Sequence, residues 1–385
     1  MSSFQRDIPG RRWPRSGKNR IHDRPRRLTH MDRRVTVVGG GVIGLSCAWR
    51  LAAAGHTVTV IAPHPGREGA SWVAAGMLAP VTEVQFGESA LTKLLIEGAA
   101  RWPAFAQDLE QASGDDIGYD QSGTLTVAAN PSDAAALKDL LTYQQSLGLT
   151  VHPRTASQCR TLVPALSPRL GAGVEVPGDH QVDNRALLAA LVTACQRHGV
   201  EFRQTSVTEL IDGPAVHLAE GGRLDADLIL LAAGTGTPGI KGLDAAALPE
   251  IRPVKGHILR LAQGPNVVRL DRTVRALVNG RSVYLVPRAD GSVVVGATVE
   301  ERGDDLGVQA GAVHQLLNDA RTVIPGIDEM HLLESSAGLR PATPDNIPFI
   351  GWTDLPGVAA ACGHYRNGML LAPYTADAMA RLLSA

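Results

Sequence analysis

Residues 34–63 carry a hydrophobic pattern that predicts a strand, a helix and a second strand in direct succession. A β-branched apolar run at 35–38 leads into a cluster of glycines, and apolar residues then recur from 43 to 52 at the spacing of one buried helix face. Gly55 stands where a helix-ending glycine belongs, and a second apolar run covers 58–61. The pattern predicts one βαβ unit of about 30 residues.

Further along, the same periodicities predict a mixed arrangement of helices and strands. Helices are expected at 88–112, 132–147, 184–198 (with Asp183 as N-cap), 313–323 and 373–383. Strands are expected at 123–129, 201–210, 224–232 and 357–361. From 251 the pattern alternates, which predicts antiparallel strands at 253–261, 275–278, 282–288 and 292–298, the last two joined by a turn at 289–291.

This order of elements predicts an α/β and α+β fold with domains assembled from separated segments. A Rossmann-like nucleotide-binding domain is expected from residues 31–87, 178–249 and 332–385. A substrate-binding domain with a mainly antiparallel sheet is expected from residues 88–177 and 250–331.

The glycine cluster spells GxGxxG at Gly39, Gly41 and Gly44. The first glycine permits a tight turn, the second lets a diphosphate approach the backbone, and the third lets the helix pack closely on the strand. With a strand before it and a helix after it, the motif indicates dinucleotide binding. The acidic residue that usually binds the ribose at the end of the second strand is missing, because that position is Ala62 or close to it.

Composition narrows the class of protein. The chain has 385 residues, of which 44% are hydrophobic and 19% are charged, as in an ordinary globular protein. Residues 1–30 carry +7, which leaves −8 on the rest of a chain whose total is −1. We expect this basic tail to be disordered, and an acidic body argues against nucleic acid as a partner.

Other sequence features exclude further classes. No apolar run approaches the length of a membrane span, so no membrane partner is expected. The four cysteines form no CxxC pair and are interpreted as reduced thiols of a cytoplasmic protein. The 12 histidines show no metal-ligand spacing, so no metal site is expected.

Two later segments combine arginine with small apolar residues. Arg340 lies in SSAGLRPATPDNIPFIG and Arg366 in GHYRNGMLLAP, while Tyr284 lies in SVYLVPR. An arginine in such a setting suits a bidentate carboxylate clamp, although for one isolated arginine a structural ion pair is the favoured interpretation. The segment 366–370 precedes a predicted helix, so its N–H groups could face a developing anion. The small-residue segment 69–80 suits a chain lying against a flat ligand, or else a tight core crossing.

Together these motifs resemble the D-amino-acid oxidase superfamily of FAD-dependent oxidoreductases, and within it the glycine-oxidase branch. The matching segments include GGGVIGLSCAWRLAAAGHTVTV, SWVAAGMLAP, PVKGHILRL, YLVPRADGSVVVGAT, AGLRPATPD and GHYRNGMLLAP, and they span residues 34–385. The resemblance implies that Arg340 and Tyr284 bind a substrate carboxylate and that Arg366 lies near the flavin ring and the pocket mouth. Ser282 stands where relatives often have a histidine.

The resemblance also implies a set of FAD contacts, spread over the glycine turn, the small-residue segment and the start of the last helix. They are Gly39, Gly41, Val42, Ile43, Gly44, Ala74, Ala75, Gly76, Met77, Val207, Gly234, Arg366, Asn367, Gly368, Met369 and Leu370. FAD is expected to be non-covalent, because no cysteine lies between Cys195 and Cys362, where relatives that attach the flavin often carry one.

The activity that the resemblance implies is oxidation of glycine and similar small amines to the imine, with hydrogen peroxide formed from dioxygen. The imine would serve the thiazole part of thiamine, and the enzyme would be a homo-oligomer, with a tetramer as one candidate. Sarcosine oxidase, D-amino-acid oxidase, D-amino-acid dehydrogenase and a non-catalytic FAD-binding electron-transfer subunit remain alternatives.

Overall fold

A computed structural model describes residues 32–243, 247–264 and 267–385 of the chain. The predicted basic tail over residues 1–30 lies outside the described residues. No helix in the described part is long and apolar enough to cross a membrane, and no cluster of three or more His, Cys, Asp or Glu side chains there could hold a metal ion.

The predicted βαβ unit is confirmed and forms the centre of a six-stranded sheet. It consists of β1 (Arg34–Val38), α1 (Val42–Ala53) and β2 (Thr57–Ile61). The strand order is β18-β19-β12-β1-β2-β8, and β1 runs parallel to both β12 and β2. The other strands are β8 (Glu201–Arg203), β12 (Leu228–Leu231), β18 (Phe349–Trp352) and β19 (Val358–Cys362), with β18 antiparallel to β19.

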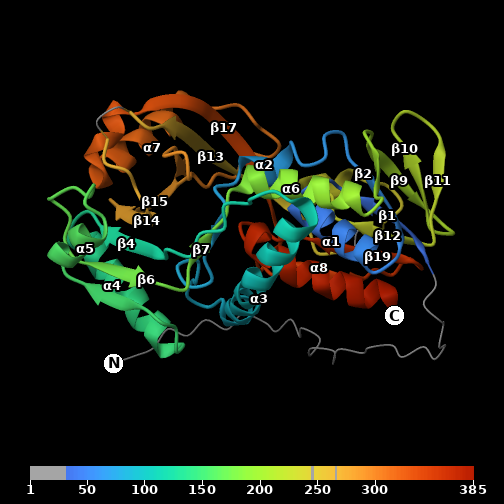
Figure 1. Ribbon diagram of the computed structural model, residues 1–385, viewed down its shortest axis with the longest axis horizontal. Coiled ribbons are helices and arrows are strands. Elements are labelled where there is room, and N and C mark those ends of the chain that lie inside the picture. Colours follow the sequence, from blue (N-terminus) through green and yellow to red (C-terminus); the bar gives the residue numbers. More distant parts are fainter. Residues whose placement is uncertain (1–31, 244–246, 265–266) are drawn as a thin grey trace, which may run out of the picture. The chain divides into compact units, whose positions relative to one another are not determined.

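Helices cover one face of this sheet and a small second sheet covers the other (Figure 1). The helices are α1, α3 (Ser89–Ser113), α6 (Asn184–Arg197) and α8 (Gly368–Ser384), and they share one apolar core. The second sheet consists of β9 (Val207–Ile211), β10 (Ala215–Leu218) and β11 (Arg223–Asp225). As predicted, Asp183 caps α6, accepting hydrogen bonds from the amides of Arg185 and Ala186.

The predicted antiparallel strands belong to an eight-stranded sheet with the order β17-β13-β16-β15-β14-β4-β6-β5. Its strands are β4 (Thr124–Ala128), β5 (His152–Arg154), β6 (Gly173–Val176), β13 (Arg252–Ala262), β14 (Thr273–Val278), β15 (Arg281–Pro287), β16 (Val293–Gly296) and β17 (His331–Ala342). The pairing of β14 with β4 is parallel, and the other pairings are antiparallel.

Smaller elements complete the described chain. A short pairing joins β3 (Met77–Leu78) to β7 (His180–Gln181). Helix α7 (Ala310–Val323) packs on one face of the eight-stranded sheet, leaving the opposite face, with Ile258 and Tyr284, for the site described below. The remaining elements are α2 (Gly69–Val73), α4 (Pro131–Ser146), α5 (Ala156–Leu162) and the 3-10 helices Gly234–Gly239 and Pro325–Glu329.

Two predicted strands were wrong in extent, because each is split between two sheets. The run 201–210 is β8 and β9, separated by the polar residues 204–206, and the run 224–232 is β11 and β12. The second break falls at Asp227, whose carboxylate accepts a hydrogen bond of 2.8 Å from the amide of Arg34. This contact holds the chain beside the start of β1, so that β12 enters the parallel sheet at Leu228.

The last helix begins earlier than predicted. Helix α8 starts at Gly368 rather than at 373, with Pro373 inside it. Residues 368–370 are therefore the first turn of the helix rather than a loop before it. Pro373 is the sixth residue of α8, so it has no amide hydrogen to donate to the carbonyl of Met369 and the helix lacks that one hydrogen bond.

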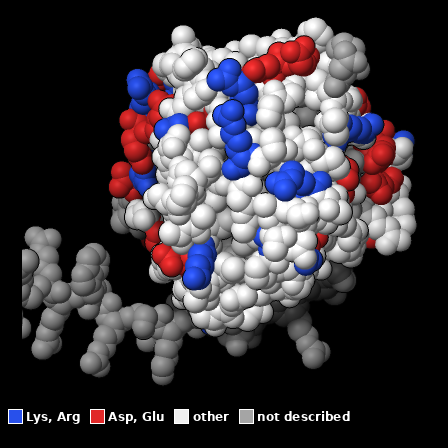
Figure 2. Space-filling view, turned by 90° about the vertical axis from the view of Figure 1, so that its left-hand side faces the viewer, with Lys and Arg blue, Asp and Glu red and all other residues white. Residues whose placement is uncertain are grey.

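The division of the chain into two domains stays a prediction. Strand pairing places β17 in the antiparallel sheet, while α3 packs against α6 and α8 beside the parallel sheet. The surface over the antiparallel end carries Lys and Arg side chains among acidic and uncharged ones rather than one broad basic patch (Figure 2).

Candidate active site

A cavity of about 740 Å³ lies where the carboxyl ends of β1, β2 and β12 meet the inner face of the antiparallel sheet. Its size is in the range of small-molecule and cofactor sites. It brings together every predicted site residue except Gly44, namely Gly39, Gly41, Val42, Ile43, Ala74, Ala75, Gly76, Met77, Val207, Gly234, Tyr284, Arg340, Arg366, Asn367, Gly368, Met369 and Leu370. Ala62 and Ser282 line it too.

The glycine turn after β1 is built as a cradle. A Cβ on Gly39 would lie 2.3 Å from the carbonyl oxygen of Ala232, and one on Gly44 would lie 2.0 Å from that of Gly39. Gly44 therefore serves packing between α1 and β1, which explains why it does not reach the cavity. The hydroxyl of Ser71 accepts a hydrogen bond from the amide of Val42 at 3.0 Å, and the first turn of α1 holds no acidic residue, so its positive end favours a diphosphate.

The small-residue segment around α2 lines the cavity with its backbone held from behind. Asn184 donates to the carbonyls of Ser71 and Trp72 at 2.9 Å each. Arg288 donates to the carbonyl of Ala75 at 2.6 Å. With these carbonyls fixed, the segment presents a firm, small-residue wall, as expected beside a flat ligand.

The start of α8 offers a second polar wall. The side-chain nitrogen Nδ2 of Asn367 is buried without a hydrogen-bond partner, and Asn367 is only 3% exposed. The first turn of α8 holds no acidic residue. An unsatisfied buried donor at a helix N-terminus fits a ligand with acceptor atoms on its edge.

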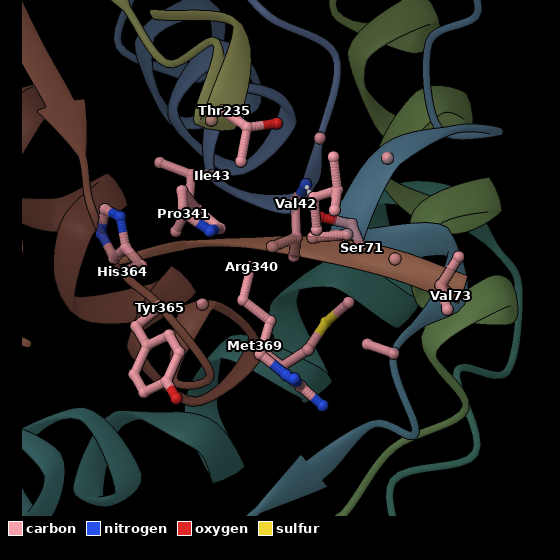
Figure 3. A pocket seen from close by; sticks show the side chains of 18 of the residues that line it. Val42, Ile43, Ser71, Val73, Thr235, Arg340, Pro341, His364, Tyr365 and Met369 are labelled. Atoms are coloured by element: carbon pink, nitrogen blue, oxygen red, sulfur yellow. Dashed lines mark hydrogen bonds between the residues drawn. The ribbon is translucent and has the colours of Figure 1, made fainter. Parts of the chain in front are cut away.

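Arg340 extends from β17 into the cavity (Figure 3). Its guanidinium lies over Gly256 of β13, where a Cβ would come within 2.2 Å and 2.4 Å of its terminal nitrogens. Nη1 donates to the carbonyls of Lys255 and Thr298 at 3.3 Å and 3.2 Å. Within residues 32–243, 247–264 and 267–385, no carboxylate forms an ion pair with it, so the structural ion pair considered from the sequence does not describe Arg340.

Tyr284 reaches over the sheet from the opposite direction. Its ring lies across Gly296 of β16, where a Cβ would be 2.4 Å from the hydroxyl oxygen. Burial raises the pKa of this hydroxyl, with Arg340 acting in the opposite direction, so it remains a hydrogen-bond donor. Two glycines on adjacent central strands thus make room for a cation and a hydroxyl that converge, which is a suitable arrangement for a carboxylate.

Sequence reasoning missed three charged residues of the cavity, Glu68, Glu83 and Arg275. Glu83 forms ion pairs with Arg275 and with Arg366, the latter between Oε2 and Nε at 2.5 Å. Burial acts to raise the pKa of Glu83, but the two arginines outweigh it and lower the pKa to about 2. Arg366 is therefore already paired with a carboxylate of the protein, unlike Arg340.

The signal for Arg275 was present in the sequence. Asn279 and Gly280 both have positive φ angles, 53° and 76°, and they form the two-residue turn between β14 and β15. Counting outward from that turn places Arg275 opposite Tyr284, as the register shows. Glu83 has no such signal, because it lies in an irregular segment.

Two further buried residues line the cavity near β19. Burial lowers the pKa of His364 to about 3, so its ring is neutral, and Nε2 lies 3.0 Å from the hydroxyl of Thr375. Burial raises the pKa of the Cys362 thiol to about 12. A protonated thiol is a weak nucleophile, which disfavours covalent attachment of a ligand at Cys362.

Comparisons with known proteins agree with this geometry. Residues 34–382 match the family model described as FAD dependent oxidoreductase. The chain is 32% identical to a glycine oxidase of Geobacillus kaustophilus, covering 91% of this chain and 92% of that one. A crystal structure of glycine oxidase from the same organism superposes with a TM-score of 0.83 over 91% of this chain and 95% of the other, at 32% identity. The chain is also 31% identical to a bifunctional protein ThiO/ThiG of a Nostoc species, of which it spans 53%.

The turn at Gly39 and Gly41, the wall at 71–76 and the unsatisfied Asn367 amide fit the diphosphate, flat ring system and polar ring edge of FAD. The residues present therefore suit the cofactor of this family. Only the ribose lacks the usual acidic partner, since Ala62 lines that end of the cavity.

Proposed function

The chain belongs to the FAD-dependent oxidoreductase family, and from that premise we propose that it oxidises glycine and similar small amines or amino acids to the imine. Dioxygen is the electron acceptor and hydrogen peroxide the second product. The similarity to glycine oxidases at 32% and 30% identity over nine-tenths of the chain supports this reaction over others in the family.

The observation that carries the proposal is the free guanidinium of Arg340. A cation held by two carbonyls, without a carboxylate partner among the described residues, gains a counter-charge only when an anion binds. The carboxylate of an amino acid supplies that anion, with the Tyr284 hydroxyl as a second donor. This fixes the carboxylate end of the substrate and leaves its α-carbon free to face the ring.

The chemistry of hydride acceptance belongs to FAD when it is bound. The protein's part is to hold the substrate, and no proton acceptor among its side chains is needed if the amine binds uncharged. Glu83 is a poor acceptor because two arginines lower its pKa to about 2. The first turn of α8, with Gly368, Met369 and Leu370, would donate to the polar edge of the ring and stabilise negative charge there.

The roles of the individual residues belong to the proposal. Arg340, Tyr284 and Arg366 form the substrate end, and the glycine turn, the wall at 74–77, Val207, Gly234 and residues 367–370 form the FAD end. FAD is held without a covalent bond. The high pKa of the Cys362 thiol supports this, since Cys362 is the one cysteine among the described residues that lines the cavity.

The alternatives within the family differ in the substituent that the substrate carries on its amine nitrogen or on its α-carbon. Sarcosine oxidase and D-amino-acid oxidase or dehydrogenase activities would use the same clamp, so a panel of glycine, sarcosine and D-alanine ranks them. A non-catalytic FAD-binding subunit would need no free cation in the cavity, which the geometry of Arg340 argues against. The match to ThiO/ThiG supports use of the imine for the thiazole part of thiamine.

Assembly and location are further parts of the proposal. We expect a homo-oligomer, a tetramer being one candidate, in the cytoplasm. The four cysteines are all free and buried, which agrees with a reducing compartment. Light scattering of the purified protein would decide the assembly, and a monomer would contradict the proposal.

The test of the function is Arg340→Ala, with Arg340→Lys beside it. Loss of charge-assisted hydrogen bonds to the carboxylate should reduce kcat/KM for glycine by roughly 30- to 1000-fold. Lysine should rescue poorly, because an ammonium cannot reproduce the planar fork. Peroxide formation and flavin content are measured on the same preparation. Normal glycine kinetics in a flavin-loaded Arg340→Ala protein would remove the residue from the site, and a wild-type protein inactive on all three substrates would refute the reaction.

A further inference from the structure

One carboxylate bridges two arginines at the substrate end of the cavity. Glu83 contacts Arg275 through Oε1 and Arg366 through Oε2, and its side chain is only 10% exposed. Arg366 also donates from Nη2 to the backbone carbonyl of Glu83 at 3.0 Å. In its satisfied orientation, the amide oxygen of Gln85 accepts from both terminal nitrogens of Arg366, at 2.8 Å and 2.7 Å.

Arg275 holds this carboxylate from the antiparallel sheet. It stands on β14 opposite Tyr284, with its side chain 13% exposed, and it also donates to the hydroxyl of Thr82 at 3.3 Å. Asp179 fixes the preceding residues, because its carboxylate accepts from the amides of Val81 and Thr82 at 2.9 Å and 3.1 Å. Glu83 is therefore set in place by the sheet on one side and by Asp179 on the other.

We propose that Arg275 is a positioning residue for the substrate end: by holding Glu83, it keeps the guanidinium of Arg366 aimed into the cavity. This inference rests on the proposed function for its meaning, since the group positioned is one expected to meet the amino-acid substrate. Its geometric basis is independent of that function. The segment carrying Arg366 leads into α8, so Glu83 is also the tie between this segment and the antiparallel sheet.

The charges around Glu83 explain why a second arginine is needed. Arg275, Arg366 and Arg340 all favour its ionised form, whereas burial favours the neutral form. Tyr284 lies close to the pair, and Asp179 interacts with Arg275. Without Arg275, the buried carboxylate would keep one direct cationic partner, and its pKa would rise. Protonation of Glu83 would then release Arg366 as the pH falls.

The experiment compares Arg275→Gln and Arg275→Lys with a matched control, Arg281→Gln. Arg281 belongs to the neighbouring strand β15 and pairs at 2.6 Å with Asp319, a carboxylate only 2% exposed, but it does not line the cavity. The control therefore removes an arginine from a carboxylate on the same sheet without touching the site. Flavin content, melting temperature, and kcat and KM for glycine between pH 5 and 9 are measured for each protein.

Arg275→Gln is expected to keep its flavin and to raise KM for glycine by about 10- to 100-fold, with a smaller change in kcat. Its kcat/KM should decline more steeply than that of the wild type as the pH drops from 7 to 5, because loss of Arg275 raises the pKa of Glu83 and also that of Asp179, which burial raises to about 6 and Arg275 opposes. Arg275→Lys retains the charge and should lack this extra decline. Arg281→Gln should lower the melting temperature and leave KM and the pH profile unchanged.

Flavin-loaded Arg275→Gln with wild-type KM and an unchanged pH profile would overturn the proposal, as would an equal KM change in Arg281→Gln. If Arg275→Gln does not fold, the KM of Arg275→Lys for glycine is used instead. A raised KM supports the proposal, and a wild-type KM contradicts it. Acetate, which carries a carboxylate but no amine to oxidise, is titrated in parallel by its effect on the flavin absorbance. A weakened acetate affinity in Arg275→Gln supports positioning even if the wild type fails to turn over glycine, so the two failures are distinguishable.

Discussion

Gly256 offers a direct test of how the carboxylate clamp is built. Replacing it by alanine adds one methyl group beneath the guanidinium of Arg340 and leaves the arginine itself intact. The added Cβ would stand 2.2 Å from Nη2, 2.4 Å from Nη1 and 2.5 Å from Cζ. Because carbon and nitrogen in ordinary contact are roughly 3.5 Å apart, the guanidinium must move by about 1 Å.

That movement has a predictable consequence. Arg340 would lose its hydrogen bonds to the carbonyls of Lys255 and Thr298, because these bonds are already 3.3 Å and 3.2 Å long. Its guanidinium would then no longer be held in its present orientation. A displacement of about 1 Å at a substrate-positioning group costs on the order of 100-fold in kcat/KM. Overpacking would also destabilise the fold by about 1–3 kcal/mol, partly offset by the lower entropy of alanine in the unfolded chain.

The assay is peroxide formation from glycine by protein of known flavin content. Gly311→Ala serves as control, because that glycine lies in α7 with nothing within 4 Å of its added Cβ. Gly256→Ala should keep FAD and lose kcat/KM, whereas Gly311→Ala should keep both. A flavin-loaded Gly256→Ala protein within threefold of wild-type kcat/KM would show that the position of Arg340 over Gly256 is irrelevant to the reaction.

Two other outcomes follow from the cavity. The pKa of Glu83 is lowered to about 2 in the folded chain from 4.5, so its contribution to the free energy of unfolding, on the order of 3 kcal/mol, is present above pH 4.5 and is lost as the pH falls toward 2. Glu83→Gln should therefore show a shallower decline between pH 5 and 3 in urea unfolding, and an equally steep decline would contradict this. Acid or heat should release intact FAD into the supernatant, since the Cys362 thiol is protonated by its raised pKa, and yellow denatured protein would contradict non-covalent binding.

Local patterns in the sequence predicted the nucleotide half of the cavity well. The βαβ unit is continuous in the chain, so the apolar periods and three glycines specify strand, turn and helix together. The same reasoning failed where strands are short and change sheet, as at 201–210, because an apolar run does not say which neighbour it will pair with. Strand β17 was missed for a related reason, since its glycine and proline weaken any strand pattern.

The substrate end depends on contacts that are remote in the sequence. Glu83 and Arg366 stand 283 positions apart, and neither segment has a regular pattern that would predict their pairing. The register of β14 and β15 was accessible, because the Asn279-Gly280 turn fixes it and places Arg275 opposite Tyr284. Motifs therefore identified the residues of the site, but not the charges that surround them.

The difference between Arg340 and Arg366 shows why this matters. Both arginines lie in small-residue segments, and Arg340 was expected to bind the substrate carboxylate while Arg366 was expected near the flavin ring and the pocket mouth. Arg366 shares the carboxylate of Glu83 with Arg275 and is further bound by Gln85, so an incoming carboxylate must compete with the protein for it. Arg340 contacts the backbone carbonyls of Lys255 and Thr298 and the hydroxyl of Tyr284, and among the described residues no carboxylate forms an ion pair with it. We therefore propose Arg340 as the primary carboxylate clamp, with Arg366 acting through the geometry that Glu83 and Arg275 would impose. The two arginines are therefore expected to differ in role because they differ in the number and position of the carboxylates around them.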